Sequence, residues 1–172
     1  MDDKEKRFER AKETALNFLT HSMRTEEQVR KRLGDKGFVS EEADYVIAFL
    51  KEFGYIDDFE YAVSYIEYAA GKGHGARRIK DEMRRRGIDR NTIEDAFYEH
   101  ENRASEFGSK VASEEERAFA EALRIVSGKE IDDKIIAKTG RRLKTLGYES
   151  GVIYSAVGKL MKMKGNGDDD FE

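Results

Sequence analysis

The sequence predicts an all-α protein made of three tandem three-helix, helix-turn-helix-like repeats that form an elongated, curved molecule. Apolar residues recur at i, i+3, i+4 and i+7 along most of the chain, which is the period of an amphipathic helix. None of the 172 residues is proline, so long helices meet no proline break. Residues with capping chemistry stand where the apolar stripes begin, which marks separate helices.

Helical stripes and capping residues follow one another in chain order. The apolar stripes fall at residues 43–50, 62–69, 93–100, 119–126 and 153–160. Thr25 and Ser113 each stand three residues before a glutamine or glutamate, which is the spacing of a capping box. Ser40 precedes two glutamates that suit the positive end of a helix dipole. Asp89, which follows a Gly-Ile pair, is a further expected N-cap.

A glycine-centred pattern occurs three times. An apolar residue lies four positions before each glycine, and a large apolar residue follows it directly. These glycines are Gly37, Gly87 and Gly147. With the helices before and after them, they define expected repeats at residues 8–57, 58–103 and 112–163. We expect a linker at 104–110 and a disordered acidic tail at 164–172.

The segment GYIDDFEYA, which starts at Gly54, places two acids between two helical stripes. Gly54 suits the left-handed position that closes a helix. Asp57 or Asp58 can accept backbone N–H bonds from the next helix, and Tyr55 and Ile56 are expected to pin the turn to a core. We therefore interpret the acids as a cap and turn. A metal site or a catalytic pair of carboxylates is the alternative.

Composition argues against several functions. The chain has no cysteine, which excludes disulfides, thiolate zinc sites and cysteine nucleophiles. Its three histidines do not have the spacing of a compact zinc site. No apolar run reaches the roughly 20 residues of a membrane helix, and the N-terminus has no signal-peptide core. We expect a cytoplasmic, monomeric protein that is not an enzyme and has no metal, cofactor, membrane partner or small-molecule substrate.

Basic residues concentrate in one segment of an acidic protein. The net charge is −4, yet residues 72–90 hold eight basic and three acidic residues. The candidate partner-binding residues in this segment are Arg77, Arg78, Lys80, Arg84, Arg85 and Arg86. A smaller set precedes them at Arg24, Lys31, Arg32 and Lys36. Helical spacing turns Ile79 and Met83 to the core and Arg77 and Arg84 outward. A solvated helix face is the alternative interpretation.

Three motifs resemble one family. They are GYIDDFEYA, GARRIKDEMRRRGI from Gly75, and MRTEEQVRKRLGDKGF from Met23. Together they resemble the RecX proteins of bacteria, which regulate the RecA recombinase, over about residues 15–160. Six residues form the structural signature of this resemblance: Gly54, Tyr55, Asp57, Asp58, Ala62 and Gly87. The resemblance implies three tandem three-helix units, no catalysis, and binding in the groove of the RecA–DNA filament.

The resemblance implies a regulator that binds the RecA filament and inhibits its ATPase and strand exchange, in recombination, DNA repair and the SOS response. DNA within the filament is a further expected partner. Two alternatives stay open: an autonomous DNA-binding module with the basic helix in a groove, and a helical scaffold for another protein. The acidic net charge argues against strong autonomous DNA binding, because phosphate contacts carry most nonspecific affinity.

Overall fold

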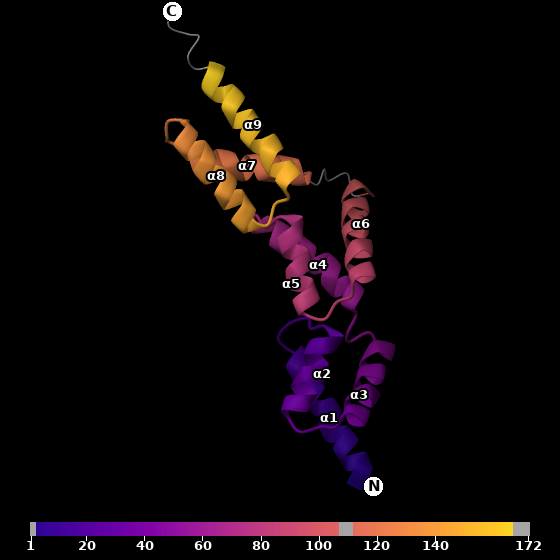
Figure 1. The fold of residues 1–172 in the computed structure, drawn as a ribbon. Coiled ribbons are helices and arrows are strands. Elements are labelled where there is room, and N and C mark those ends of the chain that lie inside the picture. Colours follow the sequence, from indigo (N-terminus) through magenta and orange to yellow (C-terminus); the bar gives the residue numbers. More distant parts are fainter. Residues whose placement is uncertain (1–2, 107–111, 167–172) are drawn as a thin grey trace, which may run out of the picture. The chain divides into compact units, whose positions relative to one another are not determined.

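The computed structural model describes residues 3–106 and 112–166. These residues form nine α-helices and no strand (Figure 1). The helices are α1 (Asp3–Leu19), α2 (Glu26–Asp35), α3 (Ser40–Glu52), α4 (Asp58–Gly71), α5 (Ala76–Arg85), α6 (Arg90–Glu106), α7 (Glu114–Val126), α8 (Asp133–Leu146) and α9 (Ser150–Asn166). The prediction of an all-α fold is confirmed.

We call α1–α3, α4–α6 and α7–α9 the first, second and third helix triplets, after the expected repeats, whose limits stay a prediction. The chain divides into two compact units, and the division runs through all three helices of the second triplet. Unit 1 comprises Met1–Ser64 and Glu82–Glu99, and unit 2 comprises Tyr65–Asp81 and His100–Glu172. Each unit therefore combines one whole triplet with part of the second.

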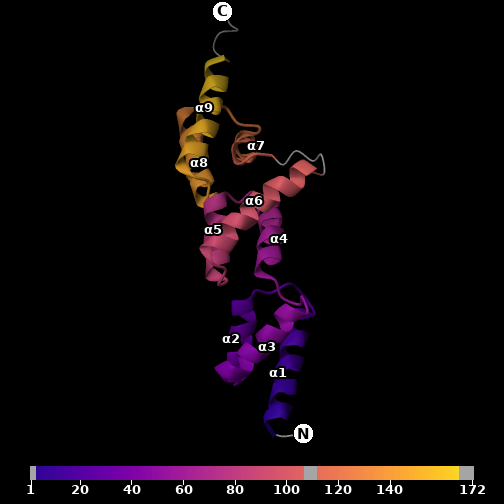
Figure 2. The ribbon, with the colours of Figure 1, turned by 90° about the vertical axis from the view of Figure 1, so that its right-hand side faces the viewer.

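Each helix of the first triplet packs against the other two (Figures 1 and 2). The side chains of Ala15, Val29, Leu33, Val46 and Leu50 are fully buried in its core. Alanines on α1 let the larger side chains of α2 and α3 approach its backbone. Burial of such aliphatic side chains contributes about 1.5–3 kcal/mol each before the entropy of ordering is counted, so this triplet has a core of its own.

A partly buried ion pair ties α1 to α3. The Nε and Nη2 atoms of Arg7 donate hydrogen bonds to the two carboxylate oxygens of Glu42. The backbone N–H of Val39 donates a third, at 2.9 Å. These bonds favour the ionised carboxylate and lower the pKa of Glu42 to about 2. The pair therefore stabilises the packing of the first and third helices wherever Glu42 is ionised.

The third triplet has a separate core in unit 2. Its three helices contact one another, and the side chains of Ala118, Ala122, Leu143 and Leu160 are fully buried. Tyr148 is 1% exposed, and burial raises the pKa of its hydroxyl. Figures 1 and 2 show α9 running alongside α8. The buried stripe of α8 therefore faces the other two helices.

Buried residues of the second triplet also follow the helical period. They are Ala62, Val63, Ile66 and Ala69 on α4, Ile79 and Met83 on α5, and Ile93 and Ala96 on α6. The prediction that Ile79 and Met83 face the core is confirmed, since neither is exposed. Because these two residues lie four apart, they fix which face of α5 carries the arginines.

The expected helix starts are found at all four positions. Thr25 and Ser113 form the predicted capping boxes at α2 and α7. Asp89 accepts the backbone N–H groups two and three residues further on, at the start of α6. Helix α3 begins at Ser40, and the two glutamates that follow stand in its first turn as predicted. The Glu42 carboxylate also accepts the Val39 N–H, which precedes this helix.

Helices extend into the expected linker and tail. Helix α6 continues to Glu106 and α9 to Asn166, so residues 104–106 and 164–166 are helical. The remainder of both expectations, at 107–110 and 167–172, lies outside the described residues. Within residues 3–106 and 112–166, every helix is too short or too polar to cross a lipid bilayer.

Candidate functional site

The two acids of GYIDDFEYA cap two different helices. Asp57 Oδ1 accepts the N–H groups of Phe59 and Glu60 at 2.9 and 3.0 Å, at the start of α4. Asp58 Oδ1 accepts the N–H of Glu26 at 2.8 Å, at the start of α2. Partial burial raises the pKa of Asp58, and the bond from Glu26 opposes that shift. Both carboxylates therefore satisfy backbone donors that a helix start leaves without partners.

The remaining signature residues shape the turn before α4. Gly54 has a φ of +68°, and Ala62 is fully buried. Ile56 is 4% exposed and pins the turn as predicted. Tyr55 is 55% exposed, so the prediction that it is pinned to the core is wrong. Successive residues of a non-helical segment point to opposite sides, and the Tyr55 ring lies against Phe49 with 6.4 Å between centroids.

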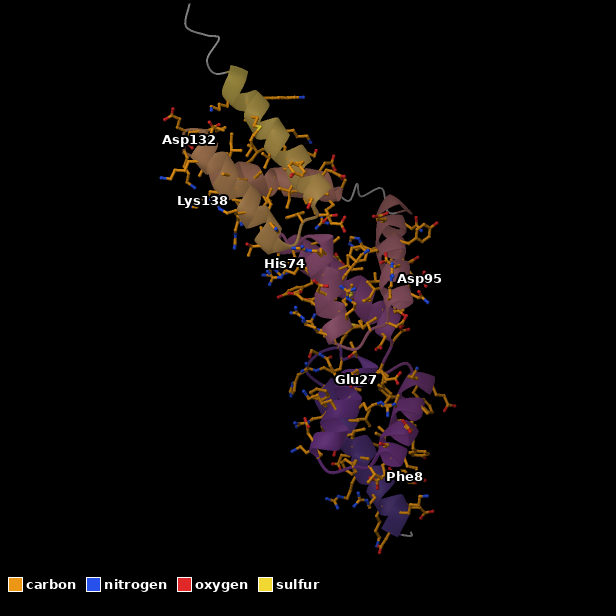
Figure 3. The ribbon with its side chains drawn as sticks, viewed as in Figure 1. Phe8, Glu27, His74, Asp95, Asp132 and Lys138 are labelled. Atoms are coloured by element: carbon orange, nitrogen blue, oxygen red, sulfur yellow. The ribbon has the colours of Figure 1, made fainter. Side chains whose placement is uncertain are left out.

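A contact that we call the first joint connects α2 to the second triplet within unit 1. The Thr25 hydroxyl donates a hydrogen bond to Arg86 O at 2.6 Å. The next residue after Arg86 is Gly87, with a φ of +85°, and a Cβ on it would lie 2.3 Å from Glu27 Cβ. With the bond from Glu26 to Asp58, these contacts fix the start of α2 against the end of α5 and the start of α4. Glu27 is labelled in Figure 3.

The second joint, within unit 2, connects α5 to the third triplet through equivalent positions. The N–H of Gly75 donates to Leu146 O at 2.8 Å, and the N–H of Ala76 donates to the Glu114 carboxylate at 2.8 Å. Gly147 has a φ of +89°, and a Cβ on it would lie 2.2 Å from Arg78 Cβ. His74, labelled in Figure 3, directly precedes Gly75, and its carbonyl accepts a bond from Arg117 at 3.2 Å.

Three predicted binding residues occupy the first half of α5, in unit 2. Arg77 is exposed, and its Nη2 donates to Lys144 O at 3.2 Å. Arg78 is half-buried because its Cβ fills the space beside Gly147. Lys80 is also half-buried. Arg77 therefore combines a joint contact with exposure to solvent, whereas the Cβ of Arg78 is packed against Gly147 in the joint.

The other three predicted residues of α5 lie in unit 1. Arg84 and Arg85 are exposed, and Arg86 is half-buried. Two cations in the last turn of a helix also complement its dipole. The cations of Arg86 and Arg24 oppose the rise in the pKa of Tyr61 that burial causes. Arg77, Arg84 and Arg85 are thus the exposed members of the predicted basic helix.

The smaller basic set of the first triplet is divided between ring contacts and open surface. The Arg24 and Arg32 guanidinium carbons lie 4.5 and 5.5 Å from the centroid of the Phe18 ring, within the range of a cation–π interaction. Lys31 and Lys36 are exposed. Arg24 is half-buried, so Lys31, Arg32 and Lys36 present the accessible charges of this set.

A further basic group, which was not predicted from the sequence, lies on the third triplet. Arg124, Lys129, Lys138 and Arg142 line one groove of the third triplet. Lys138 and Arg142 stand four residues apart, a spacing that is visible in the sequence. Their convergence with Arg124 and Lys129 depends on how α7 and α8 pack, which no local pattern shows.

No metal centre appears in the part of the chain that the structure describes, because no three acidic or histidine side chains there come together as ligands. The carboxylates of Asp57 and Asp58 are engaged by backbone N–H groups instead. Burial lowers the pKa of His100, which favours a neutral side chain. The described residues therefore define an all-helical protein with exposed basic side chains on several of its helices.

Comparison with known proteins identifies the family. The model of the first three-helix domain of RecX matches residues 11–50, and that of the second matches residues 57–96. A regulatory protein RecX of Vibrio vulnificus is 31% identical over 123 residues, which cover 67% of this chain and 80% of that protein. A regulatory protein RecX of Clostridium tetani is 29% identical over 162 residues, which cover 94% of this chain and 72% of that protein. The chain belongs to the RecX family of regulatory proteins.

Solved structures agree on the fold. The crystal structure of RecX from Lactobacillus salivarius has a TM-score of 0.75 and 22% identity, and the match covers 90% of this chain and 97% of that one. A second crystal structure, of a regulatory protein RecX, has a TM-score of 0.68 and 24% identity. That match covers 88% of this chain and 71% of the other chain. At these identities the likeness shows the fold alone.

Proposed function

We propose that this protein binds the RecA recombinase filament and mainly inhibits its ATPase and strand exchange, and so acts in recombination, DNA repair and the SOS response. Membership of the RecX family is the observation that carries this proposal. The protein acts by binding and performs no reaction of its own. DNA within the filament is a second contact.

The exposed arginines of α5 support a charged interface. Arg84 and Arg85 project from the last turn of the helix, whose opposite face is buried through Ile79 and Met83. An arginine can form two parallel hydrogen bonds to one carboxylate or phosphate. Such groups on the filament are therefore the expected partners of this face.

Inhibition requires that the protein distinguish two states of its partner. A ligand shifts an equilibrium only through a difference in its affinity for the two states. We propose that the protein binds the active filament less tightly than a state that releases subunits or excludes a second DNA.

The test is inhibition of the DNA-dependent ATPase of RecA by the wild type and by an Arg84→Glu, Arg85→Glu variant. Each lost charge-assisted contact costs roughly 1–3 kcal/mol. We therefore expect half-inhibition to require at least about tenfold more of the variant. Arg77 is a poorer probe than Arg85, because its bond to Lys144 O would be lost as well.

The matched control is Arg10→Glu with Lys162→Glu, which changes the net charge equally at two exposed residues of α1 and α9. The control should inhibit like the wild type. Equal inhibition by the arginine variant and the control would remove α5 from the interface. If the wild type leaves the ATPase unaffected but binds naked DNA tightly and with steep salt dependence, the autonomous DNA-binding module replaces the proposed function.

A further inference from the structure

A groove on the third triplet collects positive charge from two helices and the loop between them. Its walls are Glu121, Arg124 and Ile125 of α7, Lys129 of the loop, and Lys138 and Arg142 of α8. Four of these six side chains are basic and one is acidic, in a chain with a net charge of −4. Lys138 is labelled on α8 in Figure 3. All six residues belong to unit 2.

The single acid of the groove is already neutralised. Arg124 donates from Nε and Nη2 to the two carboxylate oxygens of Glu121 at 2.9 and 2.7 Å. Glu121 is nearly buried, whereas the Arg124 side chain is 75% exposed. A guanidinium has five N–H donors, so Arg124 keeps three for a further partner. The carboxylate therefore orients Arg124 and does not compensate the other cations.

Lys129 is also held in place. Its Nζ donates to Ile125 O at 2.5 Å, at the C-terminal end of α7, where the helix dipole favours a cation. An ammonium group has three donors, so two stay available. The loop thus presents a fixed positive charge at one end of the groove.

Lys138 and Arg142 supply the opposite wall. They stand one helical turn apart, about 6 Å along the axis, and like charges at this spacing repel each other. Both side chains are exposed, and the described residues provide neither of them with an ion pair or a hydrogen bond. Two adjacent cations without a counter-ion can both contact an anionic chain that lies along the helix.

We propose that this groove binds a single strand of nucleic acid through its phosphates. A phosphate backbone offers a row of regularly spaced anions, which matches cations that repeat along α8 and recur on the facing wall. A single strand can follow a groove whose two walls are both charged, whereas a duplex presents its phosphates on a wide cylinder. Contacts of this kind position a strand without reading its sequence.

An acidic peptide fits the groove less well. Protein interfaces combine a hydrophobic centre with a polar rim, but Ile125 is the one apolar residue among the six that line this groove. Phosphates need only cations and N–H donors. The exposed Arg77, which contacts Lys144 O at the other end of α8, adds a further cation beside the same helix within unit 2.

The test is fluorescence anisotropy of a labelled, mixed-sequence single-stranded oligonucleotide with the full chain at low salt. For Lys138→Glu with Arg142→Glu we expect at least tenfold weaker binding. The slope of log K against log salt should fall by about 1.4, because each phosphate contact to a single strand contributes about 0.7. The control, Arg10→Glu with Lys162→Glu, should lose no more than about twofold. Helicity measured by circular dichroism verifies that both variants fold.

This inference does not rest on the proposed function, because the assay contains no recombinase. The variant that keeps charge, Lys138→Arg with Arg142→Lys, should bind like the wild type. Equal weakening by the groove variant and the control overturns the proposal, as does absence of oligonucleotide binding by the wild type. Tighter binding of a duplex than of the single strand overturns the assignment to a single strand. Unchanged oligonucleotide binding combined with weaker inhibition of RecA would assign the groove to a protein partner instead.

Discussion

The two joints have the same kinds of residue at equivalent positions but differ in the donor group that bridges the neighbouring helices. In each, an acid at the first residue of one helix, Asp58 or Glu114, binds the first N–H of another. In each, a glycine with positive φ lies against that second helix. The first joint reaches the end of α5 with the hydroxyl of Thr25. The second joint reaches the end of α8 with a backbone N–H, that of Gly75.

The difference shows how one residue sets the distance between two helices. A Cβ on Gly75 would lie 2.4 Å from Gly147 C and from Tyr148 N, so only glycine allows this backbone-to-backbone approach. Thr25 instead keeps the backbones apart by the length of its side chain. Arg77 and Arg117 add bonds to carbonyls in the second joint. The second joint is therefore the closer of the two.

The largest effect should come from transferring the residue of the first joint into the second. Gly75→Thr places a Cβ against backbone atoms that cannot rotate away, and it breaks the bond to Leu146 O. Overpacking and a lost hydrogen bond together predict a loss of about 3 kcal/mol in unfolding free energy. Urea unfolding followed by circular dichroism measures this loss. A change below about 1 kcal/mol would show that the close approach is not required.

A second prediction compares the glycines that follow α5 and α2. Gly87→Ala adds a methyl group 2.3 Å from Glu27 Cβ, as well as the strain of a φ of +85°. Gly37 has a similar φ of +82°, but no atom lies within 4 Å of its added Cβ. We expect Gly87→Ala to lower the unfolding free energy by about 2–3 kcal/mol and Gly37→Ala to lower it by about 1 kcal/mol. Urea midpoints give both values, and equal losses would mean that the first joint is loosely packed.

The third prediction concerns the hydroxyl of the first joint. Thr25→Val removes both the cap on α2 and the bond to Arg86 O, and should cost about 1–2 kcal/mol. Thr25→Ser keeps both bonds but removes a methyl group from a side chain that is fully buried, and should cost about 0.8 kcal/mol. Thermal unfolding compares both variants with the wild type. A Thr25→Val protein as stable as the wild type would show that the hydroxyl contributes nothing to the joint.

The features that could be predicted from the sequence depend on residues three or four positions apart in one helix. The capping boxes at Thr25 and Ser113 and the buried pair Ile79 and Met83 follow from spacings of three and four residues. The partner of Asp58 could not be predicted, because Glu26 lies 32 residues away and meets it only through packing. The sequence therefore identified Asp57 and Asp58 as caps but could not show that they cap different helices.

The same limit explains the incomplete prediction of the binding surface. Charge density along the chain pointed to α5, where Arg84 and Arg85 are exposed. It did not distinguish them from Arg78, which fills space beside Gly147. It also passed over Lys138, because the groove that this residue lines exists only after α7 and α8 have packed together.

The smallest effect concerns the acid of the first joint. Partial burial raises the pKa of Asp58 above its ordinary value in the folded protein, with the neighbouring Glu26 carboxylate adding to the rise. Folding therefore favours the protonated acid, and the contribution of Asp58 to stability increases as pH falls through its raised folded pKa. Asp58→Asn keeps an acceptor for the Glu26 N–H but removes this titration. We expect its stability to equal or slightly exceed that of the wild type at pH 7.

Lowering the pH should reverse this order. Between pH 7 and pH 4 the wild type should gain stability relative to Asp58→Asn, which urea midpoints at both pH values measure. Glu42 provides a contrast of opposite sign, because its pKa is lowered to about 2 and its contribution is lost as pH falls toward that value. The Glu42→Gln protein should be less stable than the wild type at pH 7, and this difference in unfolding free energy should therefore become smaller on acidification. A wild type that loses stability relative to Asp58→Asn on acidification would show that the bond from Glu26, and not burial, controls the ionisation of this acid.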